Sequence, residues 1–208
     1  ESTYFRTKFE EDLDELHGRT GIGVISDHED QPILVRSHLG TFGLVTVSKI
    51  NNLEKLAENA FSRRDHFSEL SPIGVNPTEM IAMLICEQDS FVEGITYAQE
   101  KIRGSCTLLL LCKDGLYAAR DRLGRTPIII GQKPSGLAVS SETCAFPNLG
   151  YEVVRDIGPA EIVHVTADGH EQLKPPEEKM QICSFLWVYY GYPASKYEGI
   201  NVEKVRYR

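Results

Sequence analysis

Four charged residues lie within six positions of this 208-residue chain, at Arg120, Asp121, Arg122 and Arg125. Guanidinium groups in a loop could bind a phosphate, because each presents a fork of N–H donors to the phosphate oxygens. The same residues have a structural alternative, in which an Arg–Asp pair fixes the turn of the loop. We favour the structural interpretation, because loops of this kind more often hold a turn than a ligand.

A second group of candidate residues lies between positions 38 and 55. Lys49 and Lys55 could form an anion site beside Ser48. His38 could act as a general base, because a neutral imidazole accepts a proton near pH 7. The sequence places no nucleophile next to His38, so we expect a turn histidine there and surface lysines at the other two positions.

Composition limits the classes of function. A length of 208 residues suits one large domain, and a formal net charge of −8 argues against a nucleic-acid partner, which requires a clustered basic face. The five cysteines are odd in number and show no C-x-x-C spacing, so we expect buried free thiols rather than disulfides or a metal site. No segment has the roughly 18 consecutive apolar residues that a membrane span needs.

The elements that must position these side chains differ between the two halves of the chain. The first half predicts a weak helix over residues 7–16, a helix from about Asn52 with Asn51 or Asn52 as its N-cap, a helix that begins at Pro77, and a helix over residues 90–101. Short strands are predicted over residues 21–25, 33–35, 42–47, 106–112, 116–119, 128–130, 137–140, 153–155, 162–165 and 172–173. The uniformly apolar run from Cys106 to Cys112 is typical of a central strand that is covered on both faces. We expect helices flanking two layers of strands.

Aromatic side chains gather near the end of the chain, at Phe185, Trp187, Tyr189, Tyr190 and Tyr192. Packing against a following domain explains such a group better than stacking on a ligand. In a chain without that domain, we expect part of this group to be exposed.

Several motifs follow one another in an order that resembles a known family. They are Arg120-Asp121 with Gly124 and Pro127, Ser140-Ser141-Glu142-Thr143, Arg155 to Ile162, Cys183 to Ser195, and Gly199 with Val202 to Arg206. This order resembles the class II glutamine amidotransferase domain of amidophosphoribosyltransferases, enzymes of purine synthesis. The resemblance covers nearly the whole chain and is most specific over residues 104–206.

The resemblance implies an α+β fold, a four-layer αββα sandwich of two mainly antiparallel sheets of the Ntn-hydrolase type. It implies a glutaminase-like domain over residues 1–192 that lacks its first strands, and a linker over residues 193–208 that leads to a phosphoribosyltransferase domain. The expected partners are that domain and further copies of the chain, in the cytoplasm, with no nucleic acid and no membrane. No cofactor and no metal are expected.

The residues that handle glutamine in this family differ here. The family has an Arg for the substrate carboxylate where this chain has Val24, and an Asn-Gly pair for the oxyanion where it has Val47 and Ser48, followed by Lys49. Valine presents neither a guanidinium fork nor a donor, and a donor aimed at an oxyanion typically contributes about 2.7–4 kcal/mol.

The third substrate contact lies at a predicted helix start. Asn76-Pro77-Thr78-Glu79 stands where the family has Ser-Asp-Thr-Glu, whose Asp binds the α-amino group of glutamine. Proline offers no charge and no amide, so an ammonium group placed there would remain unpaired. Glu79 is retained, and we expect it to cap its helix or to pair with a basic neighbour.

The family's nucleophile is an N-terminal Cys. This chain begins with Glu1 and its first cysteine is Cys86, so no catalytic residue is assigned, and the nucleophile and opening strands are expected to precede Glu1 in a longer parent protein. We therefore expect the fold of a glutaminase without its activity. Two alternatives stay open: a glutaminase site rebuilt around Ser48, Lys49 and Asn76, and a stand-alone scaffold module.

Overall fold

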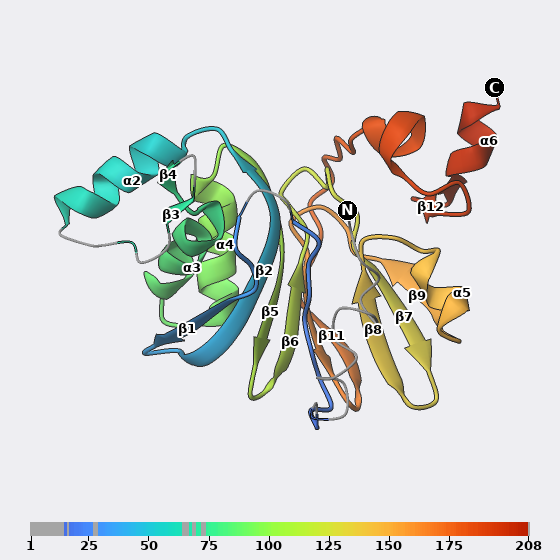
Figure 1. Ribbon diagram of the computed structural model, residues 1–208, viewed down its shortest axis with the longest axis horizontal. Coiled ribbons are helices and arrows are strands. Elements are labelled where there is room, and N and C mark those ends of the chain that lie inside the picture. The colour runs from blue at the N-terminus through green and yellow to red at the C-terminus, as the bar shows by residue number, and fades with distance from the viewer. Residues whose placement is uncertain are drawn as a thin grey trace.

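The computed structural model describes Glu15 and residues 17–26, 29–63, 67, 70–71 and 74–207. Its largest element is an antiparallel sheet of six strands in the order β1-β2-β5-β6-β10-β11 (Figure 1). The strands are β1 Ile33–Ser37, β2 Gly40–Ile50, β5 Gly104–Cys112, β6 Gly115–Ala119, β10 Ile162–Thr166 and β11 Gly169–Lys174. The predicted strands over these parts of the chain are therefore confirmed.

A second, three-stranded sheet has the order β8-β7-β9 and is also antiparallel. Its strands are β7 Ile129–Lys133, β8 Gly136–Ser140 and β9 Glu152–Asp156. A hydrophobic core between the sheets contains Ile128 and Ile130 next to and within β7, and Val163 and Val165 from β10. Apolar residues at alternating positions bury one face of each strand, which fixes the register of both sheets.

Helices cover the other face of the larger sheet (Figure 1). These helices are α2 Leu53–Ser62, α3 Pro77–Cys86 and α4 Phe91–Lys101. Between them and the sheet lies the main core, in which Leu44, Ile81 and Leu108 are completely or almost completely buried. The short helix α5, Ala145–Asn148, covers the outer face of the second sheet, where Phe146 packs so closely that a Cβ at Gly131 would lie 2.4 Å from its ring. The four-layer αββα sandwich predicted from the sequence is confirmed.

Strand β5 is the centre of this arrangement. It pairs with β2 on one side and β6 on the other, and its alternate side chains enter different cores, Leu108 on the helical face and Leu109 between the sheets. The strand begins at Gly104, whose φ is +141° and where a Cβ would lie 1.7 Å from the carbonyl oxygen of Lys49. Only glycine allows this approach of β5 to β2.

At two of the three helices α2, α3 and α4, the N-cap residue uses its side chain to cap the first turn. Asn76 caps α3 and Ser90 caps α4 through side-chain oxygens that accept backbone N–H bonds. Asn52 occupies the N-cap position of α2 but caps nothing, because its side chain bonds to the carbonyl of Lys101 and the N–H of Arg103 instead. It joins the start of α2 to the connection between α4 and β5.

The strand predicted over residues 21–25 is wrong. These residues form neither helix nor strand, and Ile25 is 99% exposed. Ile22 lies against Gly43 of β2, so the segment crosses the sheet rather than pairing with it. Gly21 and Gly23 add no packing side chains, and no strand in the described part of the chain pairs with this backbone. The helix predicted over residues 7–16 falls almost entirely outside the described residues.

The last part of the chain folds back onto the sandwich. It contains a single π-helical turn, η2 Leu186–Tyr190, a two-stranded ribbon of β12 Lys196–Tyr197 and β13 Ile200–Asn201, and the helix α6 Val202–Arg206. Trp187, Tyr197 and Val202 form a small core of their own. A second ribbon pairs β3 Leu70–Ser71 with β4 Gly74–Val75. Whether residues 193–208 lead to another domain stays a prediction.

All five cysteines are free thiols, but only Cys106 is fully buried. Cys183, which was expected to be buried like the other cysteines, is exposed, and so is the neighbouring Phe185. Among the described helices, none combines the length and the apolar character that a membrane crossing requires.

Candidate functional site

The end of β2 and the start of α3 bring several of the singled-out positions together. The hydroxyl oxygens of Thr46 on β2 and Thr78 on α3 lie 2.7 Å apart and share a buried hydrogen bond. Ser48, two residues along the same strand, places its hydroxyl 3.5 Å from that of Thr46. These contacts join the helical layer to the sheet at positions that the sequence resemblance aligns with the substrate contacts of the family.

The first turn of α3 is closed by groups from the chain itself. The side-chain oxygen of Asn76 accepts hydrogen bonds from the backbone N–H groups of Thr78 at 2.8 Å and Glu79 at 3.4 Å. Pro77 occupies the first position of the helix, where the N–H that it lacks would have had no partner. The first turn therefore has its capping acceptor without any ligand.

Glu29 adds a carboxylate at the same place. Its Oε2 accepts hydrogen bonds from the N–H of Thr78 at 3.2 Å and from the hydroxyl of Thr78 at 2.9 Å. A negative charge is favoured at a helix N-terminus, because the unpaired N–H groups there carry partial positive charge. Glu29 was not among the residues singled out from the sequence, since nothing local relates it to a helix 49 residues further along the chain.

Gln31 holds the segment that carries Glu29 in place. Its side-chain oxygen accepts from the N–H of Thr46 at 2.7 Å, and its amide donates to the carbonyl of Thr46 at 3.2 Å. These two hydrogen bonds have the same pattern as those between paired residues of two antiparallel strands. They give Gln31 a structural role, for which the sequence offered no signal.

Three of the positions singled out from the sequence, Val24, Val47 and Lys49, lie outside this group of contacts. Side chains alternate between the two faces of a strand, so Val47 and Lys49 point away from Thr46 and Ser48. Val47 is 49% exposed, and the Lys49 side chain makes no hydrogen bond or ion pair within the ranges that the structure describes. Val24 is partly buried in the irregular segment before β1. The positions thus divide between a polar cluster under α3, the exposed side chains of Val47 and Lys49 on the opposite face of β2, and Val24 in the irregular segment.

The loop after β6 holds buried charges that stabilise the fold. Arg120 is completely buried and donates to the carbonyls of Gly124, Thr126 and Ile157 and, at 2.6 Å, to the carboxylate of Glu198. All of its donor nitrogens are therefore engaged, so it has none to offer a phosphate.

Asp121 fixes the turn through backbone groups. Its carboxylate accepts from the N–H groups of Leu123, Arg125 and Thr126. For Arg120 and Asp121 the structural interpretation is confirmed, but the Arg–Asp pair within the loop joins Asp121 to Arg125 at 3.5 Å. Arg120 pairs instead with a residue 78 positions away, which no local pattern in the sequence indicates.

Two further matched motifs also hold the backbone. Glu161 is 1% exposed and pairs with Arg155 at 2.8 Å. Burial by itself raises the pKa of Glu161, but hydrogen bonds from Arg155, from Gln172 and from the N–H of Gly158 outweigh it, so the pKa lies below its ordinary value. Glu142 accepts hydrogen bonds from Ser195 at 2.8 Å and Tyr197 at 3.0 Å, which anchors the last segment of the chain.

His38 is a turn residue between β1 and β2, as predicted. Its Nε2 lies 2.9 Å from the carbonyl oxygen of Gln88. In the described part of the chain, no cluster of three or more His, Cys, Asp or Glu side chains could hold a metal ion.

The fold and the ordered motifs can now be compared with known proteins. Residues 16–148 match the family described as glutamine amidotransferase domain. The chain belongs to that family. It is a class II glutamine amidotransferase domain, homologous to the N-terminal part of amidophosphoribosyltransferases.

Curated relatives extend the match beyond the family's own bounds. The amidophosphoribosyltransferase of Methanothermobacter thermautotrophicus is 29% identical over 209 residues, which cover 94% of this chain and 43% of that protein. The amidophosphoribosyltransferase of Methanocaldococcus jannaschii is 28% identical over 222 residues, covering 95% of this chain and 47% of the relative. The chain therefore spans less than half the length of these two relatives.

A solved structure is similar over the same part. Glutamine phosphoribosylpyrophosphate amidotransferase from Bacillus subtilis, in complex with ADP and GMP, superimposes with a TM-score of 0.73 and 26% identity. The match covers 84% of this glutamine amidotransferase domain and 38% of the Bacillus chain. The Ntn-hydrolase type of the sandwich is thereby established.

Proposed function

We propose that this glutamine amidotransferase domain does not hydrolyse glutamine and serves as a structural or regulatory docking domain of an amidophosphoribosyltransferase-like protein. The parent protein would transfer an amine from free ammonia or another donor to phosphoribosyl pyrophosphate. The proposal places it in the cytoplasm as a homo-oligomer, with a phosphoribosyltransferase domain as the partner of this chain and with no nucleic-acid or membrane partner.

The observation that carries the proposal is the closed first turn of α3. A glutamine substrate needs an anion for its ammonium group and a cation for its carboxylate. At the matching positions this chain has Pro77 and Val24, and the nearby carboxylate of Glu29 already bonds to Thr78. A bound amino acid would have to compete with these internal hydrogen bonds and would leave its own charges unpaired.

The oxyanion position supports the same proposal. Val47 offers no side-chain donor, and its side chain lies on the face of β2 opposite to that of Ser48. Without a donor aimed at the developing negative charge, amide hydrolysis loses what is usually the largest electrostatic contribution to catalysis.

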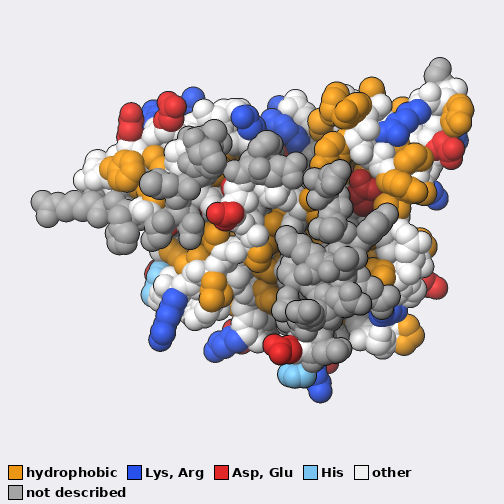
Figure 2. Space-filling model, in the orientation of Figure 1, with side chains coloured by type: hydrophobic (Ala, Val, Ile, Leu, Met, Phe, Trp, Pro, Cys, Tyr) orange, Lys and Arg blue, Asp and Glu red, His pale blue; other side chains and the backbone are white. Residues whose placement is uncertain are grey.

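A docking role is supported by the aromatic segment near the end of the chain. Trp187 points inward and donates from its indole N–H to the carbonyl of Ile200 at 3.0 Å. Its neighbours point outward: Phe185, Val188, Tyr189, Tyr190 and Tyr192 are between 55% and 75% exposed. They contribute to the orange patches near the C-terminal helix in Figure 2. Exposed apolar groups of this kind mark contact surfaces.

Glutamine titration tests the proposal directly. We expect no saturable heat of binding when glutamine is added to this chain in a calorimeter, and no ammonia release above the blank. A rebuilt site would bind glutamine, and the change Lys49→Ala would abolish that binding. Sustained ammonia release, or binding that depends on Lys49, would contradict the proposal. The Bacillus relative serves as the positive control.

A further inference from the structure

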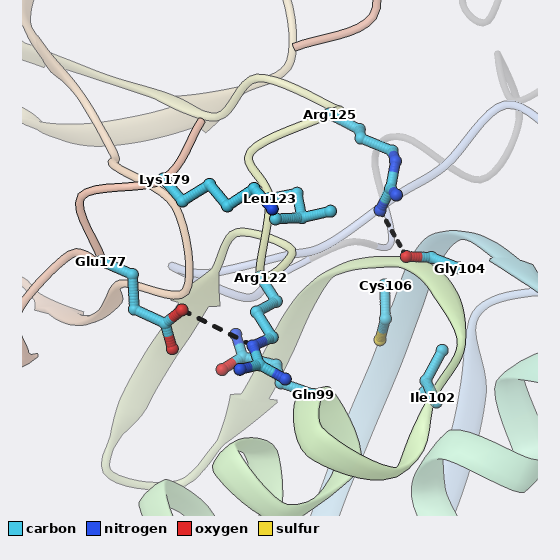
Figure 3. Close-up of a pocket in the computed structure, with 9 residues that line it drawn as sticks. All are labelled: Gln99, Ile102, Gly104, Cys106, Arg122, Leu123, Arg125, Glu177 and Lys179. Atoms are coloured by element: carbon cyan, nitrogen blue, oxygen red, sulfur yellow. Dashed lines mark hydrogen bonds and ion pairs between the residues drawn. The ribbon is translucent and has the colours of Figure 1, made fainter. Parts of the chain in front are cut away.

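A cavity of about 330 Å³ lies between the end of α4, the start of β5, the loop after β6 and residues 177–179 (Figure 3). None of its lining residues belongs to the Thr46–Thr78 cluster described above. Its size falls at the lower end of the range of about 300–1,000 Å³ that is typical of small-molecule sites.

The floor of the cavity is apolar and uncharged. It includes Ile102 and Leu123 together with the buried thiol of Cys106. Burial, with a smaller contribution from the Asp121 carboxylate, raises the pKa of Cys106 to about 12, so the thiol is neutral at physiological pH. This floor suits the carbon skeleton of a small metabolite.

Basic side chains surround the opening. Arg122, Arg125 and Lys179 line the cavity with a single carboxylate, that of Glu177. A fourth cation, Lys174, lies behind the wall, where its Nζ bonds to the side-chain oxygen of Gln99 at 3.2 Å. Such a concentration of positive charge is unexpected in a chain whose net charge is −8.

Two of the cations are available to a ligand. Arg125 is engaged, because it donates to the carbonyl of Gly104 at 2.5 Å. Arg122 makes only a long, exposed pair with Glu177 at 3.5 Å, and such pairs contribute little to stability and exchange readily. Lys179 makes no hydrogen bond or ion pair with any part of the chain that the structure describes. In Figure 3, the Lys179 side chain extends toward Leu123, and the Arg122 guanidinium lies beside Gln99 on the side that faces Glu177.

The walls are fixed before any ligand arrives. The carboxylate of Asp121 holds the loop that carries Arg122, and the N–H of Gln181 donates to the carbonyl of Leu123 at 2.7 Å. On the other side, the N–H of Glu177 donates to the carbonyl of Pro159 at 2.8 Å. A preformed site loses little conformational entropy when a ligand binds.

We propose that this cavity binds a small metabolite through a phosphate or dicarboxylate group, held by Arg122 and Lys179 above the apolar floor. Phosphate and carboxylate share the oxygen geometry that a guanidinium fork recognises. The site is independent of glutamine hydrolysis, so it stands whether or not the domain is active.

The test is a titration of this chain with inorganic phosphate in one arm and succinate in the other, each at constant ionic strength. Binding is followed by NMR of the backbone amides. We expect saturable shifts confined to the amides around residues 99–106, 122–125 and 177–181. Saturation by phosphate alone, by succinate alone or by both identifies the anion, and saturation by neither overturns the proposal.

Variants separate a specific site from general electrostatic attraction. The double change Arg122→Ala with Lys179→Ala should weaken binding at least about tenfold, as expected for the loss of two charge-assisted contacts. The matched control, Lys113→Ala with Lys196→Ala, removes the same charge from exposed positions elsewhere and should leave affinity unchanged. Equal weakening by both double variants, or by neither, would refute the site. Lys179→Arg keeps the charge and should retain binding, and unchanged amide spectra of the free variants confirm folding.

Discussion

The start of α3 and the loop after β6 both match the family in sequence position, yet the two regions differ in what their residues do. In the loop, Arg120 and Asp121 bond to backbone groups and to the charged side chains of Glu198 and Arg125, so both are used to hold the fold. At the start of α3, Pro77 stands where the sequence resemblance places a substrate-contacting Asp, and Asn76 and Thr78 form hydrogen bonds within the chain. The motif match in the loop reflects the fold, whereas our proposal is that the match at α3 no longer reflects the chemistry.

The difference has an energetic basis. A buried guanidinium that loses its partners leaves several polar groups unsatisfied, so the fold depends on it. A side chain that only contacts substrate contributes nothing to folding, and its replacement leaves the structure intact. Variants in the two regions should therefore have very different effects on stability, and two comparisons test this.

The largest effect is expected for Arg120→Ala. The change leaves the Glu198 carboxylate and three carbonyl groups without their donor, and breaking a buried pair in this way costs about 3–5 kcal/mol. Denaturant unfolding measures the loss. The control Arg122→Ala lies two residues away, is largely exposed, and should change stability by less than about 0.5 kcal/mol. Similar losses in the two variants would remove the basis of the comparison.

A smaller effect is expected for Glu29→Gln at the start of α3. The amide keeps an oxygen that can accept from Thr78 but loses the charge that interacts with the helix N-terminus, a change of about 0.5–1 kcal/mol. Glu54→Gln is the matched control, because Glu54 lies in the first turn of α2 without capping it. A loss for Glu29→Gln as large as that for Arg120→Ala would show that this region, too, supports the fold.

The smallest effect is expected for Asp156→Asn on β9. Its Oδ1 is buried without a partner in the described structure, and burial, followed by the nearby Glu198 carboxylate, raises the pKa of Asp156. A raised pKa means that the folded chain favours the protonated, neutral carboxyl group. The stability that this neutral group contributes is lost as the carboxyl group ionises, when the pH rises above the ordinary aspartate pKa of about 3.9.

Asp156→Asn should therefore stabilise the chain at pH 7, by less than about 1 kcal/mol, and have no effect below pH 4. Thermal unfolding across this range measures the difference. A gain that is the same at both pH values would show that ionisation is not the cause.

Local sequence patterns predicted most of the elements. The apolar run of β5, the Asn-Pro start of α3 and the Asp-Gly turn that leads into β6 each encode their conformation within a few residues, so they could be identified without a structure. The segment over residues 21–25 has the same apolar character but is not a strand, because a strand also requires a neighbouring strand with free hydrogen-bonding groups.

By itself, the sequence determined the order of helices and strands and the ordered motifs of the family. Only the tertiary structure decided that Arg120 pairs with Glu198, that Glu29 bonds to the start of α3, and that Arg122 and Lys179 share a cavity. The reason is physical: backbone conformation and periodicity depend on near neighbours, whereas the partner of a charged side chain depends on which distant segments the fold brings within about 3 Å of it.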